Sequence, residues 1–275
     1  MRAGREPCRL PETLLGLALL AAAFLLPSAA EARCDPELVR RPGGALLRRV
    51  ADAGREAAPR ISIEWFGHSA FHLVSPGGTR LLTDPFGPEL GLPVPEVSPH
   101  AITVGREHPH HNSVWVARGA PLVLRGLGEG GMAWAEVRKT VGDVLVYNVP
   151  VTQRTFEVST KGSAFVFEMG GLCIAHLGDV AEALTPSQLR RLGKVHVAMI
   201  PIGGTFTVGP EEAVGIVRQV QPNIAIPMHY WDDEDRLQRF LRGVGHQVRR
   251  VGRGPFFVSR ENLPRPTLVV VLSHD

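Results

Sequence analysis

From Ile61 onward, short apolar runs alternate first with turn residues and then with helical segments. Runs of this length bounded by Gly, Pro, Asn and Asp are typical of strands, and helices placed between later strands indicate layered α/β structure. A Gly- and Pro-rich stretch over residues 86–99 predicts a long surface loop. The predicted strands cover residues 61–65, 71–74, 80–83, 101–104, 121–124, 144–149, 164–167, 172–175, 195–200, 223–226 and 267–272.

Three helices are predicted from their start signals. Thr185 and Gln188 have the spacing of a capping box around Pro186, which suits the first helical position. Pro210 opens the second helix and is followed by two glutamates, which favour the positive end of a helix. The acidic pair at residues 232–233 opens the third helix.

The first residues have the features of an export signal. Three arginines precede an apolar run over residues 14–26, and small residues follow the run, so we expect cleavage after Ala32. An uncleaved anchor is the alternative, but no dense basic cluster follows the run. A lipoprotein is less favoured because Arg33 precedes Cys34. We therefore predict a signal peptide over residues 1–32, a lead segment over 33–60 and one domain over 61–275, in a periplasmic or secreted protein without a stable membrane anchor after cleavage.

The charge of the chain argues against a nucleic-acid partner. The formal net charge is +3, and the predicted signal segment carries as many arginines as glutamates, so the mature chain keeps that value. No dense basic run is present. We expect a small-molecule substrate or ligand instead.

Two cysteines, Cys34 and Cys173, remain after the predicted cleavage. They could form a disulfide in an oxidising compartment. Cys173 lies in an apolar run typical of a buried strand, which favours a free buried thiol.

A histidine cluster follows the predicted strand at residues 101–104. His108, His110 and His111 are close enough in sequence to reach one metal ion from a single loop. The alternative is a solvated His-rich loop without a ligand.

Three further polar residues stand at predicted strand ends, where α/β folds build sites. Each has a structural alternative: Asp84 and Asp179 could cap turns, and His229 could be a core histidine. Together with the histidine cluster they indicate a metal site. His100 and His196 receive no role from the sequence.

The order of these motifs resembles a known family, the ascorbate-phosphate-lactonase-like branch of the metallo-β-lactamase superfamily. The resemblance covers nearly all of the chain from Ile61 and implies an α/β, metallo-β-lactamase-type αββα four-layer sandwich. The motifs that carry it are residues 65–71, 83–85, the histidine cluster, 176–179, 201–204 and 226–230.

The resemblance implies two metal positions, of which the first is altered. The family loop has the pattern His-x-His-x-Asp-His, and here Arg106 stands at its first histidine while His108 keeps the second. No histidine lies between His111 and His176, so Gln153 stands near the third ligand position. An arginine is always cationic and cannot bind zinc.

The second position is better preserved. The resemblance implies His110, His111, Asp179 and His229 as its ligands, with His110 in place of an aspartate. We therefore expect one ion, zinc or else manganese or iron, with His108 as a further candidate ligand. The resemblance also implies that His68 and Asp84, with Arg106, support the ligands without binding the ion.

Two functions fit this pattern. The first is a metal-dependent hydrolase acting on a lactone, amide or phosphoester, with Asp179 as the catalytic residue that orients or deprotonates water. The second is a non-enzymatic descendant that keeps the fold, and one metal at most, to bind a ligand.

Overall fold

The computed structural model describes Cys34, residues 60–156 and residues 158–274. The predicted signal segment lies outside the described residues, and of the lead segment only Cys34 and Arg60 are described. No helix within the described part of the chain is long and apolar enough to cross a membrane.

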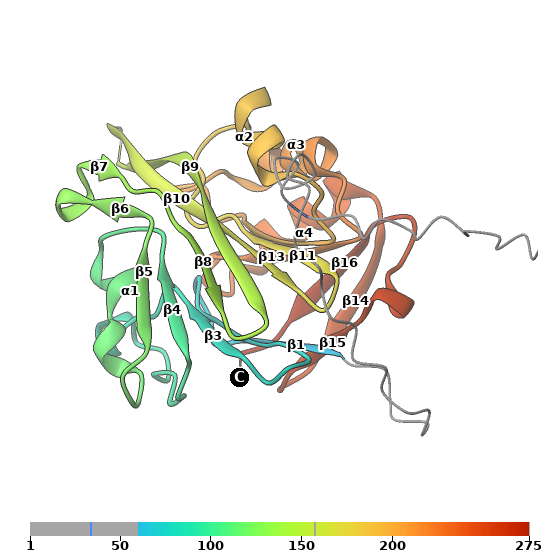
Figure 1. Cartoon of the computed structure of the whole chain (residues 1–275). Helices are drawn as coiled ribbons and strands as arrows, with labels where there is room; N and C mark the ends of the chain where they lie inside the picture. The colour runs from blue at the N-terminus through green and yellow to red at the C-terminus, as the bar shows by residue number, and fades with distance from the viewer. Residues whose placement is uncertain (1–33, 35–59, 157, 275) are drawn as a thin grey trace, which may run out of the picture. The chain divides into compact units, whose positions relative to one another are not determined.

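Two large β-sheets form the body of the domain (Figure 1). The first has the order β15-β1-β2-β3-β4-β5 and comprises β1 (Ile61–Trp65), β2 (Phe71–Val74), β3 (Arg80–Thr83), β4 (Ala101–Val104), β5 (Leu122–Arg125) and β15 (Phe256–Val258). The second has the order β14-β16-β13-β12-β11-β10-β9-β8 and comprises β8 (Arg138–Val141), β9 (Val144–Thr155), β10 (Val158–Met169), β11 (Leu172–His176), β12 (Val197–Pro201), β13 (Ile224–Met228), β14 (Gln247–Val251) and β16 (Leu268–Leu272). A separate hairpin pairs β6 (Leu127–Gly128) with β7 (Ala133–Trp134).

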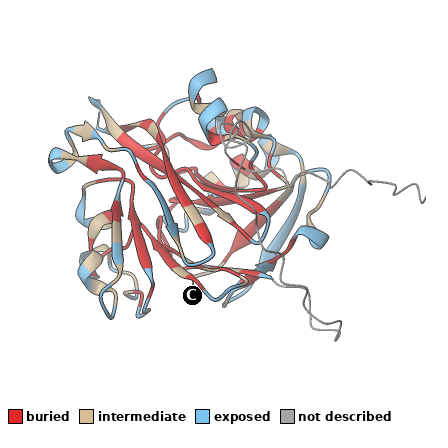
Figure 2. Cartoon of the chain, in the orientation of Figure 1, coloured by how far each residue is buried: buried red, intermediate tan, exposed pale blue. Residues whose placement is uncertain are grey.

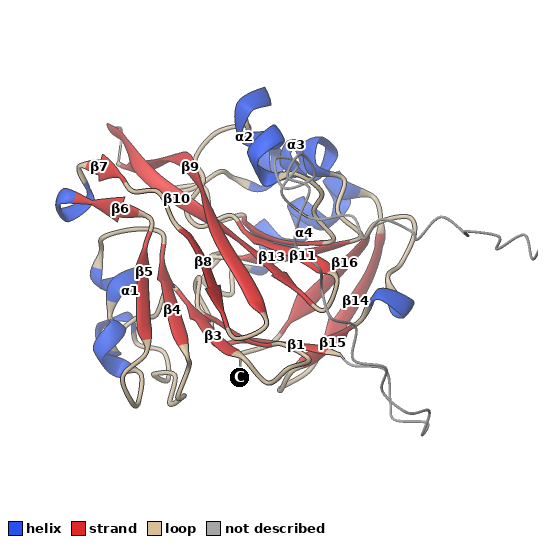
Figure 3. Ribbon diagram, in the orientation of Figure 1, coloured by secondary structure: helices blue, strands red, loops and turns tan. Residues whose placement is uncertain are grey.

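The helices lie outside the sheets (Figure 3). The capping box of Thr185 and Gln188 is present at the start of α2 (Pro186–Leu192), as predicted. The other helices are α1 (Pro109–Asn112), α3 (Pro210–Val220) and α4 (Glu234–Val244), and the short 3-10 helices are η2 (Pro88–Leu90), η3 (Val114–Val116), η4 (Glu129–Gly131) and η5 (Arg260–Asn262).

The main hydrophobic core combines residues of both sheets and of helices α2, α3 and α4 (Figure 2). Strands β12 and β13 are buried along their whole length, as expected for parallel strands covered on both faces. A smaller core of Leu82, Ile102 and Val104 lies on the other face of the first sheet, where Val114 of η3 packs on it. The predicted α/β sandwich of two sheets with outer helices is confirmed, with only short helices on the side of the first sheet.

Each predicted strand is present in the structure, but two of them are much longer than predicted and other strands were not predicted. The strands predicted at residues 144–149 and 164–167 belong to one antiparallel hairpin, β9–β10, whose arms are 12 residues each. Strands β8, β14 and β15 were missed, and so were the two-residue strands β6 and β7. Charged residues dominate β8 and β14, so no apolar run marks them, and their pairing with β9 and β16 supplies the stabilising hydrogen bonds instead.

The prediction of a free thiol at Cys173 was wrong. Cys173 does lie in the buried strand β11, but it forms a disulfide with Cys34 across a Cα–Cα distance of 5.5 Å. The sequence placed Cys173 correctly in the core, whereas it held no information on where the segment of Cys34 runs.

The topology brings several strand ends to one place. Strands β11, β12 and β13 are parallel, so their carboxyl ends lie along the same edge of the second sheet. Strands β3 and β4 are also parallel and end together in the first sheet. Polar side chains that follow these strands can therefore meet between the two sheets, as in other α/β folds.

Candidate metal centre

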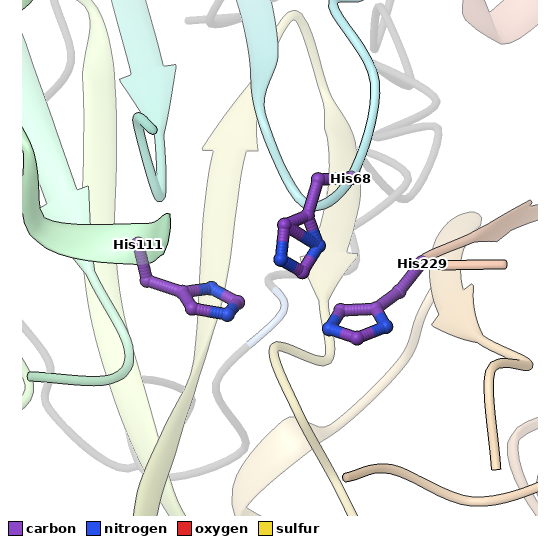
Figure 4. A group of neighbouring side chains, drawn as sticks. All are labelled: His68, His111 and His229. Atoms are coloured by element: carbon purple, nitrogen blue, oxygen red, sulfur yellow. The ribbon is translucent and has the colours of Figure 1, made fainter. Parts of the chain in front are cut away.

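Three buried histidines from three separate elements face one another (Figure 4). His68 lies in the turn between β1 and β2, His111 in α1, and His229 directly after β13. One ring nitrogen of each lies within 4.8 Å of the others, a spacing that a single metal ion could bridge. We call these residues the three-histidine group.

The backbone holds this group together. The His229 amide donates a hydrogen bond of 3.1 Å to the His68 carbonyl, which also accepts one of 3.2 Å from the Trp65 indole. The His176 ring bonds the Ser69 carbonyl at 2.9 Å and so ties β11 to the same turn. The placement of His68 differs from the sequence-based expectation, which gave it only a supporting role.

Asp179 lies beside the group and is itself buried. Its Oδ2 is 3.1 Å from the Nε2 of His111, and its Oδ1 is 3.5 Å from the Nε2 of His229. Zinc–nitrogen and zinc–oxygen bonds of about 2.0–2.2 Å place neighbouring tetrahedral ligand atoms roughly 3.4 Å apart, so these distances suit ligands of one ion.

Asp84 reaches the group from behind His111. Its Oδ2 is 3.2 Å from the Nδ1 of His111, and its Oδ1 accepts a hydrogen bond of 2.7 Å from the Gly105 amide. A carboxylate on the far nitrogen of a ligand histidine fixes the orientation of the ring and makes it a better ligand. The supporting role of Asp84 stays a prediction, for which this contact gives a physical basis.

Arg106, which the resemblance predicts at the position of a metal ligand, forms hydrogen bonds to two side chains near the group. Its Nη1 donates to the Oδ2 of Asp179 at 2.7 Å, and its Nη2 donates to the Oγ1 of Thr155 at 3.0 Å. The guanidinium also lies 5.8 Å from the centre of the Phe206 ring. A buried, permanently positive group is therefore bonded directly to the carboxylate of Asp179.

Two predicted ligands lie outside the three-histidine group. His108 is exposed and His110 is half-buried, and the His108 ring caps α1 by accepting a hydrogen bond of 3.3 Å from the His110 amide. Of the three loop histidines, only His111 is buried. Gln153 is buried on β9 in the same part of the fold.

The electrostatics of the group favour a bound cation. Burial lowers the pKa of His229 to about 4, and burial together with His229 and His111 lowers the pKa of His68 well below its ordinary value. Burial opposes ionisation of Asp179, but His111, His229 and Arg106 outweigh it and hold the pKa of that carboxyl well below its ordinary range. Burial also disfavours charge on His111, but Asp179 and Asp84 raise its pKa to about 9.

The residues present fit a divalent metal. His68 Nδ1 and Asp179 Oδ1 are buried atoms without a hydrogen-bond partner, and unpartnered buried polar atoms are rare in folded proteins. Neutral imidazoles and an ionised carboxylate are the donor set that zinc and related ions prefer. A bound ion would satisfy such atoms and would displace the proton of His111.

A cavity of about 270 Å³ opens onto His229. The residues that line it are Gly203, Thr205, Phe206, His229, Trp231, Asp233 and Arg236. Trp231 also lines a second cavity of about 200 Å³ on the side of His68, and its ring lies 4.9 Å from the His68 ring. The sequence analysis missed Phe206, Trp231 and Arg236, although an exposed tryptophan two positions after a predicted ligand was a usable signal.

Fold and site together define a metal-dependent hydrolase of the metallo-β-lactamase type. Residues 62–229 match the beta-lactamase superfamily domain, so the chain belongs to this superfamily.

Individual relatives agree with this assignment. A UPF0173 metal-dependent hydrolase of Symbiobacterium thermophilum is 31% identical over 212 residues, which cover 70% of this chain and 93% of the relative. One from Methanopyrus kandleri is 29% identical and covers 68% and 94% of the two chains. A Thermotoga maritima structure, assigned to the Zn-dependent hydrolases of the metallo-beta-lactamase superfamily, superposes with a TM-score of 0.60 at 29% identity and covers 77% and 98%.

Proposed function

We propose that this protein is an exported hydrolase that uses a single divalent ion, zinc or else manganese or iron, to cleave a lactone, an amide or a phosphoester. The observation that carries the proposal is the convergence of the three-histidine group on Asp179, which is fixed by Arg106. We assign His68, His111, His229 and Asp179 as the ligands of the ion.

Arg106 supports one ion rather than two. Two unit charges about 4 Å apart repel by about 4 kcal/mol at an effective dielectric near 20, and a divalent ion would be repelled about twice as strongly. Arg106 is held near Asp179 by hydrogen bonds and is largely buried, so its charge is poorly screened. A second ion bridged by Asp179 would have to compete with this guanidinium.

Each residue of the site has a separate role in the proposed hydrolysis. A bound ion would act as a Lewis acid that polarises the substrate oxygen and promotes ionisation of water. Asp179 has its Oδ2 held by Arg106, and as a ligand of the ion its carboxylate would orient the attacking water beside that ion. Asp84 keeps the His111 ring in place.

The cavity beside His229 suits a small-molecule substrate. Phe206 and Trp231 offer apolar contact, whereas Thr205 and Arg236 offer hydrogen bonds near the proposed reaction centre.

The disulfide supports export. Cys34 is the second residue after the predicted cleavage site, and a cysteine pair buried in a fold stays reduced in most cytosols but oxidises in the periplasm or outside the cell. We predict that the exported protein begins at Arg33. Intact-mass measurement of protein from the periplasm tests this, and a mass that retains residues 14–26 would rule out cleavage.

Metal counting by plasma mass spectrometry tests the single-ion proposal. We expect close to one ion per wild-type chain, none in His229→Ala, and an unchanged count in Gln153→Ala. The triple change Arg106→His, His110→Asp, Gln153→His restores the family pattern and should raise the count toward two. Two tightly held ions in the wild type, or none after loading with zinc, manganese and iron, would refute the proposal.

Turnover is tested separately with the loaded protein on a panel of lactones, esters, amides and phosphodiesters. We expect hydrolysis of at least one class, with loss of activity in Asp179→Asn. A protein that holds its ion but turns over no class on the panel would instead favour the non-enzymatic, ligand-binding descendant.

A further inference from the structure

The proposed ligand set leaves two histidines of the loop without a role in metal binding, and both lie next to the three-histidine group. We infer that His108 and His110 form an outer site that captures the divalent ion at the surface and transfers it inward to the three-histidine group. The inference rests on the proposed function, because it assumes that this group holds the ion.

The five histidines form a continuous path. The His108 and His110 ring centres are 4.7 Å apart, and His110 is 5.9 Å from His68. From His68 the next steps are 4.6 Å to His111 and 4.0 Å to His229. Each ring therefore lies close enough to the next for an ion to exchange one imidazole for another without returning to bulk water.

Burial increases along the same path. His108 is exposed and His110 is half-buried, whereas His68, His111 and His229 are only 6%, 2% and 3% exposed. Apart from the cavity that opens onto His229, these ligands are shielded from solvent, and an ion that approaches from the side of the loop must shed its water before it enters. An outer pair that replaces part of the hydration shell stepwise would ease this entry.

The outer pair has the chemistry of a transient site. The His108 Nδ1 accepts the hydrogen bond from the His110 amide, which leaves its Nε2 available for an ion. Two imidazoles completed by water bind an ion weakly, since structural sites need four protein ligands. Weak binding is what a transfer site requires.

The rates of metal association and dissociation distinguish a transfer site from residues that bind the ion at equilibrium. Because entry and exit follow the same path, removal of the outer pair slows association and dissociation by the same factor and leaves the dissociation constant unchanged. Removal of a true ligand speeds dissociation and weakens binding. Capture by the outer pair raises the local concentration of the ion beside the three-histidine group. This local concentration determines by how much the association rate falls when the pair is removed.

The experiment uses Co²⁺ as the probe and tryptophan fluorescence as the readout, since Trp231 lies 4.9 Å from His68. The variants are His108→Asn, which keeps a cap for α1, and His110→Gln, alone and combined. His246→Gln, a half-buried histidine at the end of α4, is the matched control. Association is followed by stopped flow and release by a chelator.

In the double variant we expect both rates to fall by about tenfold, with the stoichiometry and the dissociation constant unchanged. The control should behave as wild type. Unchanged rates in the double variant would overturn the inference, and so would faster release with lost stoichiometry, because that result would make His108 or His110 a ligand of the buried ion. A wild type that takes up no Co²⁺ would overturn the proposed function itself.

Discussion

The residues nearest the candidate metal centre adopt backbone conformations that side chains with a Cβ rarely take. His68, Asp84, His229, Trp231 and Asp232 all have φ between 37° and 58°. A left-handed conformation costs a non-glycine residue of order 1 kcal/mol or more, and such strain persists where the surrounding structure imposes it. The strain is concentrated where the ligands and the wall of the cavity are positioned, which is typical of functional sites.

Asp84 allows a test at the scale of one residue. We expect Asp84→Asn to weaken metal binding by about 10- to 100-fold, because the amide loses the negative charge that orients His111. Asparagine still accepts the hydrogen bond from Gly105 and tolerates a positive φ, so the melting temperature of the metal-free protein should change little. Competition with a chromogenic chelator measures the affinity. Asp84→Ala, which also removes the acceptor, serves as the comparison, and unchanged affinity in both variants would make Asp84 a turn residue only.

At the scale of elements, His196 joins two parallel strands. Its backbone amide donates to the Cys173 carbonyl at 2.8 Å, and its Nδ1 accepts from the Cys173 amide at 2.9 Å. The side chain of His196, which comes just before β12, thus adds one more hydrogen bond between β11 and β12. His100 acts similarly, since its Nδ1 accepts from the Arg80 amide at the start of β3. Both histidines, to which the sequence assigned no role, therefore accept hydrogen bonds from the backbone of a neighbouring strand.

The hydrogen bond of His196 predicts a loss of stability in acid. Burial, with Lys194, Arg260 and Arg265, lowers the pKa of His196 to about 4, against 6.5 for the unfolded chain. Below pH 6.5 the unfolded chain binds a proton that the folded chain does not, so this stability is present above pH 6.5 and lost as the pH falls toward 4.

We expect the free energy of unfolding of the metal-free protein to fall over that interval by on the order of 1–3 kcal/mol more in wild type than in His196→Asn. Asparagine is chosen because it accepts the same hydrogen bond without titrating. Urea unfolding at several pH values gives the difference directly. Parallel pH curves for the two proteins would show that His196 does not contribute.

The same elements show what a sequence can predict. Strands such as β12 and β13 are continuous apolar runs, and α2 has its capping box, so their positions follow from local chemistry. The edge strand β14 has no such pattern and forms because β16 lies beside it. The sequence likewise placed Asp84, Asp179 and His229 after the carboxyl ends of predicted strands. That His68 joins His111 and His229, while His108 turns outward, depends on loop conformations and could not be read from spacing.

At the scale of the whole molecule, the disulfide connects the start of the predicted mature chain to strand β11 of the second sheet. The cysteines are 139 residues apart in sequence, so the bond closes a long loop. Constraining an unfolded chain over so long a loop stabilises the folded state by about 2–5 kcal/mol. Since Cys8 belongs to the predicted signal segment, the mature chain holds no other cysteine that a reductant could affect.

We therefore expect Cys34→Ser combined with Cys173→Ala to lower the free energy of unfolding by about 2–5 kcal/mol relative to the oxidised wild type. Reductant should lower the wild type to nearly the same value and leave the double variant unchanged, which separates the bond from the packing of the sulfur atoms. The ion should still bind, because Cys173 is at the opposite end of β11 from Asp179. Urea unfolding with and without reductant measures the effect. A wild type whose stability does not respond to reductant would mean that this disulfide does not form in the exported protein or does not constrain its unfolded chain.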